Sequence, residues 1–444
     1  MGPGRAREPA GSCSAPGRTS GPLGMRRRRC LPGAGGEGSP RRVNTSGRSH
    51  GVRWLDYCPT RDSCDVLRGP PSASGPEAGG RARPRHRPDG CRNAGACVLT
   101  AITGATGLLG LHLVREALAR GRRLLLLARR HPLPAPVRVE RFLRTCGAGT
   151  EELRAARTRV ETLEIVLEDG FLGLGRERFL RLADRIDVLW HCAGDISFAS
   201  DLPRARRTNV DGTRHVLRLL TAGERAPLLC HVSTVAVAGS RPDGVVEEKE
   251  LDAPSGFNTP YERSKFEAEG LVHRWVSEHG GRALVFRPSC LATLHPAHPD
   301  RPRHPLQVLA EQVGSVLRRH PGPVTLPVPE GARTNVLPVE HAASVMTEAA
   351  ARWSGDRPRV CHVVNPRDLP VTEVVAALGD RFGVPVDTTW RSSPGSVDVR
   401  LALPAYACWL SFSRTYENGG LARLGLDRPV RPVVDRDYIA AALR

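Results

Sequence analysis

Lysine is almost missing from this chain. Of its 65 basic residues only Lys249 and Lys265 are lysines, so arginine stands wherever a positive charge is enough. Aromatic residues are also scarce, at 5% of the composition, and they do not alternate with basic residues in the stripe that stacks nucleic-acid bases. The net charge of +19 therefore predicts a basic, solvated surface on the folded part of the chain rather than a nucleic-acid interface.

Long hydrophobic runs are missing too. No stretch reaches the roughly 18 apolar residues that span a membrane, and the N-terminus lacks the apolar region of a secretory signal. Six of the 12 cysteines follow Val98, singly and mostly in apolar runs, which is typical of buried thiols in a reducing compartment. We therefore expect a cytoplasmic protein. These six are Cys146, Cys192, Cys230, Cys290, Cys361 and Cys408.

The first 97 residues differ from the rest. They contain 18 glycines, 12 prolines and 18 arginines, but only seven acidic residues and little apolar periodicity. This composition predicts disorder. Two cysteine pairs, Cys58/Cys64 and Cys91/Cys97, share a five-residue gap that is not a zinc spacing, so no metal site is predicted.

Two interpretations of this segment stay open. Its arginine run, Arg26 to Arg29, suits a tail that binds nucleic acid or a membrane surface. Alternatively, the segment is not normally translated, because a start codon at Val98 would give a protein that begins LTAITGATG. We favour the second hypothesis, and N-terminal sequencing of natively expressed protein tests it: a start near Met1 contradicts it.

After Val98 short apolar runs alternate with amphipathic stretches, which is the signature of βαβ units. The pattern predicts an α/β fold with a Rossmann-type, doubly wound parallel sheet over residues 98–290, and a smaller, mainly substrate-binding region over 291–444. Helices are expected over Leu108–Arg120, Leu202–Leu220 and Pro260–His279. The expected strands are Val98–Thr103, Arg123–Ala128, Arg159–Val166, Asp187–His191, Leu228–Ser233 and Ala283–Arg287.

The first strand leads directly into the loop TGATGLLG and then into a helix. Gly104, Gly107 and Gly110 give this loop the spacing GxxGxxG. Glycines let the chain turn tightly and bring backbone N–H groups and the helix N-terminus against a pyrophosphate. Because it lies between a strand and a helix, the loop predicts dinucleotide binding rather than a structural turn.

The end of the second strand indicates which dinucleotide is bound. NAD enzymes usually place an acidic residue there for the ribose hydroxyls, whereas this sequence has Arg129 and Arg130 after Ala128. Two guanidinium groups and no carboxylate suit the 2′-phosphate of NADPH; the alternative is a pair of exposed arginines in an arginine-rich protein. After the third strand, Asp169 is placed to accept a hydrogen bond from the adenine amino group.

One of the two lysines, Lys265, follows Tyr261 by four residues in the segment YERSK. On a helix these two side chains project from one face. A free phenol has a pKa of about 10, and a neighbouring ammonium together with the nicotinamide ring is expected to lower the pKa of Tyr261, which then serves as a general acid. The segment HVSTVAVAG supplies Ser233 and Thr234, one of which is expected to hydrogen-bond the substrate oxygen.

These segments together resemble the extended short-chain dehydrogenase/reductases. Three longer segments are similar to the male-sterility branch of that family, which includes fatty acyl reductases and the thioester reductase domains of nonribosomal peptide and polyketide assembly lines. The segments that carry the family resemblance are TGATGLLG, DVLWHCAGD, TNVDGT, HVSTVAVAG, YERSK and FRPS. Those that carry the branch resemblance are GDISFASDLPRARRTNVDGT, FNTPYERSKFEAEGLV and CHVVNPRDLPVTEVV.

The resemblance implies an NADPH-dependent enzyme that reduces a carbonyl substrate, foremost an acyl thioester, which is either a small molecule or bound to a separate carrier protein. A homodimer is ordinary in the family. The resemblance also implies that Thr234, five residues before Gly239, is the catalytic hydroxyl rather than Ser233. It implies cofactor contacts from Gly104, Thr106, Gly107, Leu108, Gly110, Arg129, Asp169, Ala193, Asn209, Lys265 and Pro288.

The sequence departs from the family in two places. Gly194 stands where relatives more often carry alanine, and the stretch CLATLHPAHPDRPRHP, from Cys290 to Pro305, replaces a glycine-rich stretch that helps to shape the substrate pocket. His191 and Cys192 invite a metal or nucleophile interpretation, but their place at a strand end favours core residues.

Two other functions stay open. One is a different chemistry of the same extended family, such as an NAD-dependent nucleotide-sugar epimerase or dehydratase, or a ketone reductase. The arginines after Ala128 argue against NAD. The other is a regulatory protein that senses dinucleotides without catalysis, but such proteins commonly lose the tyrosine or the lysine, and this chain keeps both.

Overall fold

A computed structural model of the protein describes residues 98–252, 256–295, 298–320, 323–355, 359–389 and 396–444. The segment 1–97, with its expected disorder, its cysteine pairs and the hypothetical start, lies outside the described residues. All the described residues belong to one compact unit.

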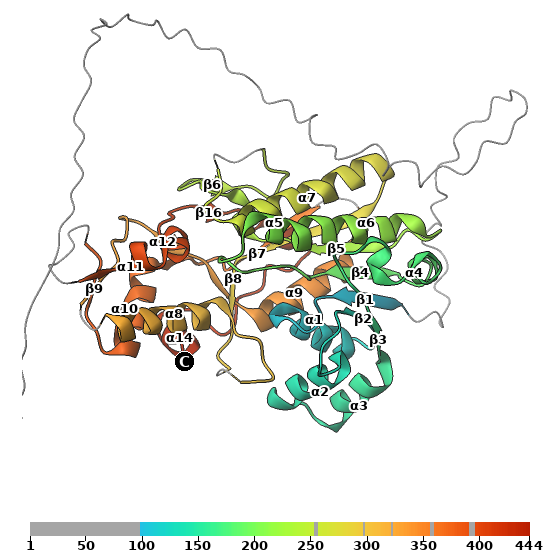
Figure 1. The fold of residues 1–444 in the computed structure, drawn as a ribbon, viewed down its shortest axis with the longest axis horizontal. Helices are drawn as coiled ribbons and strands as arrows, with labels where there is room; N and C mark the ends of the chain where they lie inside the picture. Colours follow the sequence, from blue (N-terminus) through green and yellow to red (C-terminus); the bar gives the residue numbers. More distant parts are fainter. Residues whose placement is uncertain (1–97, 253–255, 296–297, 321–322, 356–358, 390–395) are drawn as a thin grey trace, which may run out of the picture. The chain divides into compact units, whose positions relative to one another are not determined.

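A seven-stranded parallel sheet lies at the centre of this unit (Figure 1), in the strand order β12-β7-β5-β4-β1-β2-β3. The chain builds outward from β1 through β2 and β3, and then returns to add β4 on the other side. The carboxyl ends of β1 and β4 therefore meet where the strand order reverses, which is where open α/β sheets bind ligands. The strands are β1 (Leu99–Thr103), β2 (Arg123–Ala128), β3 (Val160–Glu164), β4 (Val188–His191), β5 (Leu228–Val232), β7 (Arg282–Pro288) and β12 (Val360–Val363).

Helices cover both faces of the sheet (Figure 1). The leucine run of β2 shows why the sheet needs two covers: Leu124 and Leu126 pack into one buried cluster, while Leu125 and Leu127 pack into another. A strand buried on both faces has no polar alternation, as a parallel sheet requires. One face carries α1 (Leu108–Ala119), α2 (Ala135–Thr145), α3 (Thr150–Arg159) and α9 (Val339–Arg352), and the other carries α4 (Arg176–Ala183), α6 (Gly212–Ala222) and α7 (Pro260–His279).

The predicted fold class is confirmed, with differences in detail. The helix expected over Leu202–Leu220 consists of α5 (Leu202–Arg206), a π-helical turn over Arg207–Asp211, and α6. Strand β12, which pairs in parallel with β7, was not predicted from the sequence. Together with α9, this strand shows that the sheet and its cover take residues from beyond position 290.

The C-terminal region has a core of its own, formed mainly by α8 (Pro305–Arg319), α10 (Val371–Phe382) and α14 (Arg436–Ala442). Its strands are short; β8 (Cys290–Ala292), for example, pairs only with β11 (Val336–Pro338).

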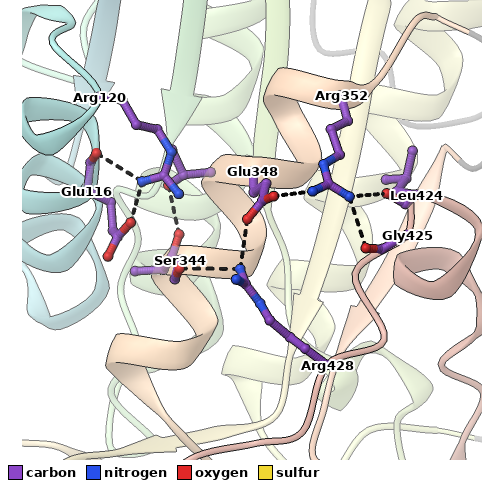
Figure 2. Close-up of polar contacts among 10 residues, drawn as sticks. Glu116, Arg120, Ser344, Glu348, Arg352, Leu424, Gly425 and Arg428 are labelled. Atoms are coloured by element: carbon purple, nitrogen blue, oxygen red, sulfur yellow. Dashed lines mark hydrogen bonds and ion pairs between the residues drawn. The ribbon is translucent and has the colours of Figure 1, made fainter.

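Ion pairs tie the chain near residue 425 to α9 (Figure 2). Arg352 of α9 donates to the carbonyl oxygens of Leu424 and Gly425, both at 2.9 Å. The Glu348 carboxylate, one turn earlier, forms ion pairs with both Arg352 and Arg428. The C-terminal region is thus fastened to a helix that also covers the sheet.

Candidate active site

The glycine loop brings α1 against the end of β4. Gly104 has φ +67°, and a Cβ added to it would lie 2.5 Å from the backbone nitrogen of Ala193. A Cβ on Gly110 would overlap the carbonyl oxygen of Gly104, which also accepts a hydrogen bond from the Gly107 N–H at 2.9 Å. Helix α1 begins at this loop with no side-chain cap, so its first N–H groups can receive a phosphate. The loop therefore fits a dinucleotide.

His191 belongs to the framework of the site rather than to its chemistry. Its Nδ1 lies 2.8 Å from Thr103 Oγ1 and its Nε2 lies 3.0 Å from Thr213 Oγ1. The Thr213 hydroxyl donates to the Asn209 carbonyl oxygen at 2.6 Å, so His191 donates from Nε2 and accepts at Nδ1. Burial, and then Lys265, lower the pKa of His191 to about 3, and burial raises the pKa of the Cys192 thiol to about 12. Neither residue has the properties of a working nucleophile, in agreement with their prediction as core residues.

Asn209 joins the loop after β4 to the catalytic helix. Its Oδ1 accepts from the Asp195 N–H at 2.7 Å, and its Nδ2 donates to Ser264 Oγ at 2.8 Å. Asn209 lies in the π-helical turn and is 2% exposed; such turns often re-aim a side chain at a functional site. A Cβ on Gly194 would lie 2.9 Å from Asn209 Oδ1, so an alanine there would require the Asn209 amide to shift slightly.

Tyr261 and Lys265 lie on successive turns of α7, whose first turn is capped by Thr259 accepting from the Glu262 N–H at 3.2 Å. The Lys265 ammonium is 2.7 Å from the Val232 carbonyl oxygen at the end of β5 and is buried. Thr234, two residues after Val232, is close enough to the Tyr261 hydroxyl to lower its pKa. The structure thus brings together the three residues that the sequence predicted as catalytic.

Ser233 and Thr234 face different partners. The Ser233 hydroxyl donates to the Glu269 carboxylate, which is itself held in a buried ion pair with Arg287. Arg287 holds the pKa of Glu269 well below its usual range in spite of burial. Because the Ser233 hydroxyl is already committed to Glu269, this geometry favours Thr234 as the hydroxyl that meets the substrate.

The pKa of Tyr261 differs from the sequence-based expectation. Burial raises it to about 12, opposed only by the nearby Thr234 hydroxyl. The Lys265 ammonium donates to the Val232 carbonyl oxygen. Burial in turn lowers the pKa of Lys265 to about 8. In the protein alone, desolvation of the phenolate therefore outweighs any help from the lysine.

One arginine of the expected cofactor site escaped the sequence analysis. Arg138 of α2 donates to Thr106 Oγ1 at 2.9 Å and to the Thr106 carbonyl oxygen at 3.3 Å. Burial, and then the charge of Arg129, lower the pKa of Arg138, so these two guanidinium groups lie near each other beside the glycine loop. Side chains in a helix point toward its N-terminus. An arginine in the first turn of the helix that follows β2 could therefore have been predicted to point back toward the end of β2.

The other predicted cofactor residues lie along the carboxyl edge of the sheet or at the start of α1. Arg129 and Arg130 are exposed after β2, and Asp169 is exposed after β3. Ala193 follows β4, and Pro288 ends β7. No helix among the described residues is long and apolar enough to cross a membrane.

The fold and the glycine loop define a nicotinamide-dinucleotide-binding protein of the extended short-chain dehydrogenase/reductase type. The chain belongs to the male sterility protein family, whose profile matches residues 102–346. This membership confirms the resemblance inferred from the motifs and places the chain among the NAD(P)-dependent oxidoreductases.

Relatives and solved structures agree with this assignment. An aldehyde reductase, lnaA, of Aspergillus flavus is 26% identical over 66% of this chain, and a carboxylic acid reductase of Mycobacterium tuberculosis is also 26% identical over 66%. The chain spans only 28% and 26% of the lengths of these two relatives. The terminal R domain of the myxalamid PKS-NRPS pathway shares the fold, with a TM-score of 0.62 and 23% identity over 79% of this chain and 90% of that domain. A UDP-galactose 4-epimerase has a TM-score of 0.54 and 16% identity, over 78% of this chain and 97% of its own.

Proposed function

We propose that this protein is an NADPH-dependent reductase that converts an acyl thioester to an aldehyde. The observation that carries the proposal is the convergence of Thr234, Tyr261 and Lys265 at the end of β5 and the start of α7, with Thr234 close enough to lower the pKa of Tyr261. The relative named a carboxylic acid reductase supports reduction at the oxidation level of an acid or thioester, and the relative named an aldehyde reductase supports reduction of a carbonyl group more generally.

The residues of the carboxyl edge suit NADPH. The loop glycines Gly104, Gly107 and Gly110 would hold the pyrophosphate, and Arg129, Arg130 and Arg138 would hold the 2′-phosphate with charge-assisted hydrogen bonds. Lys265 would hold the nicotinamide ribose, and Asp169 the adenine amino group. When bound, NADPH supplies the hydride. The remaining predicted contacts are Thr106, Leu108, Ala193, Asn209 and Pro288.

The catalytic residues manage charge and proton at the substrate oxygen. Thr234 donates a hydrogen bond that polarises the carbonyl group, and Tyr261 gives its hydroxyl proton to the oxygen as a hydride reaches the carbon. The product of this step is a hemithioacetal, which breaks its C–S bond to give an aldehyde and a free thiol. A raised tyrosine pKa keeps the proton on Tyr261 until the substrate oxygen takes up negative charge.

The partner of the reaction is a further part of the proposal. A carrier protein with an acidic surface would dock on the basic surface of this chain, and residues 291–444 would supply most contacts to the acyl group. Activity on a carrier-bound substrate should then fall more steeply with salt than activity on a small thioester, and equal salt dependence would contradict this docking. A homodimer and a cytoplasmic location stay predictions from the sequence.

The proposal is tested with the purified full-length chain. Oxidation of NADPH and of NADH is followed with thioesters, aldehydes and ketones, beside a Tyr261→Phe variant. Consumption of NADPH on thioesters that the variant loses supports the proposal. Turnover of aldehydes or ketones alone would keep the mechanism and move the substrate class. No oxidation of either cofactor, with NAD retained on the purified protein, would favour the epimerase or dehydratase alternative.

A further inference from the structure

Three aromatic rings form a line that starts at the catalytic tyrosine. The ring of Phe198 has its centroid 5.9 Å from that of Tyr261 and 5.4 Å from that of Tyr406. Tyr261 comes from α7, Phe198 from the loop between β4 and α5, and Tyr406 from α12 (Pro404–Trp409). The line therefore runs from the reacting group into the C-terminal region, and its interplanar angles of 49° and 61° are in the favourable tilted range.

The loop that carries Phe198 is held in one shape by polar contacts. The Asp195 N–H donates to Asn209 Oδ1 at 2.7 Å, and the Asp195 carboxylate accepts from the Ser197 N–H at 3.0 Å and from Ser200 Oγ at 2.6 Å. These bonds close the turn on both sides of Phe198. The ring is therefore presented by a fixed loop, and its position follows that of Asn209, which also bonds α7.

Tyr406 is anchored in the other region. Helix α12 packs on the core of the C-terminal region through Leu403, Tyr406 and Trp409. Cys290 of β8, which directly follows the end of β7, packs against the same core as Tyr406, and burial raises the pKa of Tyr406. A shift of the C-terminal region would thus change the ring line at the Tyr406 end.

The line begins at the residue that would meet the reacting carbonyl group. If the substrate oxygen is bound at the Tyr261 and Thr234 hydroxyls, the ring next to Tyr261, Phe198, is within reach of the group attached to the carbonyl carbon. The same loop exposes Ile196 to 69%, a large apolar side chain two residues before Phe198. Rings and an aliphatic side chain provide apolar contact without a charge to bind a polar group.

We propose that Phe198 and Tyr406 are specificity-determining residues that select the acyl group by the size of its first carbons. This inference rests on the proposed function. Phe198 contacts the carbons nearest the carbonyl group, and Tyr406 backs Phe198 and contacts the carbons that follow. A ring lost from the line removes contacts that only a long or aromatic acyl group makes, so the preference changes while the chemistry at Tyr261 stays.

The test measures kcat/KM of the full-length protein with acetyl, octanoyl and benzoyl thioesters of N-acetylcysteamine. Phe198→Ala should lower the octanoyl-to-acetyl and benzoyl-to-acetyl ratios by at least about 10-fold, the range expected when an apolar pocket loses contacts to its substrate. Phe198→Leu should give ratios between those of wild type and Phe198→Ala. Tyr406→Ala should lower chiefly the octanoyl-to-acetyl ratio. Tyr406→Phe keeps the ring and should match wild type.

Two controls separate selection from damage. Leu401→Ala, in α11 (Val399–Ala402) of the same region, alters a side chain that is 85% exposed and should leave every ratio unchanged. The double variant Phe198→Ala/Tyr406→Ala should lower the octanoyl ratio by less than the product of the single effects, because the two rings act together. NADPH affinity should be the same in all variants.

Equal losses on all three substrates would overturn the inference, because they would indicate a structural role alone. If wild type reduces no thioester, the proposed function fails separately, and the same variants are assayed with acetaldehyde, octanal and benzaldehyde. Changed ratios there would still support the two rings as selectors, and unchanged ratios would overturn them.

Discussion

In the dinucleotide-binding half, strands of four to seven residues form one parallel sheet that is covered on both faces. In the C-terminal region the described strands outside the central sheet have only two or three residues. Hydrogen bonds from side chains to the backbone hold many of its segments together. Arg414, for example, donates to the carbonyl oxygens of Gly239 at 2.6 Å and Arg241 at 3.1 Å. Asn335 donates to the Asn365 carbonyl oxygen at 2.8 Å.

This difference means that substitutions should affect the sheet and the C-terminal region differently. Backbone ladders do not depend on which side chain a strand carries. The predicted catalytic residues follow β5 or lie on α7, which packs on the same sheet, so they should keep their geometry through much sequence change. Contacts made by side chains are lost with a single substitution. The C-terminal region, where we propose that the acyl group binds, is therefore the one whose shape can change most readily, and the sheet with the proposed catalytic residues is the part that resists change.

The sharpest test of this contrast compares the two lysines. Lys265→Arg should lower turnover at least about 100-fold, because the buried space beneath Val232 fits an ammonium and because proton transfer at Tyr261 depends on its surroundings. Lys249→Arg should have no effect, since the Lys249 side chain is 60% exposed. Steady-state kinetics with both variants checks this. Similar activity for the two variants would contradict the catalytic role of Lys265.

The second prediction concerns an alanine substitution in the glycine loop, which we expect to destabilise the protein. Gly104→Ala should lower the free energy of unfolding by about 2–4 kcal/mol, because it combines a positive φ with overlap on the backbone of Cys192 and Ala193. NADPH binding should weaken as well. Gly149→Ala has open space around it, but Gly149 is the N-cap of α3, where alanine is less favourable than glycine, so this variant should lose at most about 1 kcal/mol. Urea denaturation and fluorescence titration measure both effects, and equal stabilities would refute the packing argument.

A pH test examines the junction between the two regions. The Glu248 side chain is fully buried and accepts from the His362 N–H at 2.7 Å and from the Gly420 N–H. Burial raises its pKa from 4.5 to about 7. The folded state therefore holds this proton more tightly than the unfolded state, and the free energy of unfolding should fall as the pH rises from about 4.5 to about 7.

The expected loss from this one group is about 2 kcal/mol between pH 5 and pH 8. Glu248→Gln should remove that part of the pH dependence, whereas Glu330→Gln, on an exposed turn of the same region, should leave it in place. Chemical denaturation at the two pH values gives the comparison. The same pH dependence in wild type and Glu248→Gln would rule out Glu248 as its source.

The smallest effect is expected at the contacts of Figure 2. Arg428 donates to Glu348 at 2.9 Å, but its side chain is 45% exposed. Arg428→Ala should cost at most about 1 kcal/mol, the usual limit for an exposed ion pair. Arg436→Ala, which breaks a more exposed pair with Asp380, should cost less. A loss above about 2 kcal/mol for Arg428→Ala would show that this fastening matters far more than its exposure indicates.

Capping residues and side-chain spacing in the sequence were enough to predict the helix that carries Tyr261 and Lys265. The helix predicted over Pro260–His279 is α7 with the same bounds, because Thr259 and Pro260 mark its start and Gly280 its end. The four-residue spacing placed Tyr261 and Lys265 on one face in the same way. Strand β12 was missed because its four residues carry no alternation that distinguishes them from a loop.

The remaining features depend on distances that no local pattern contains. The raised pKa of Tyr261 follows from burial under elements that the helix pattern does not show. The position of Arg138 beside Thr106 depends on how α2 returns to the sheet. The line from Tyr261 through Phe198 to Tyr406 joins three elements far apart in the chain, and only the packed structure brings them together.

Strand β12 has a consequence for anyone who would graft parts of this protein. The chain leaves the sheet after β7, contributes to the C-terminal region, and comes back to add an edge strand and the helix α9 before it leaves again. A transplant of everything after residue 290 would thus carry away part of the host's own sheet. Two inserts can be exchanged without removing part of the sheet, one between β7 and α9 and one after β12. Both have to be transferred together, because their side chains pack in one core.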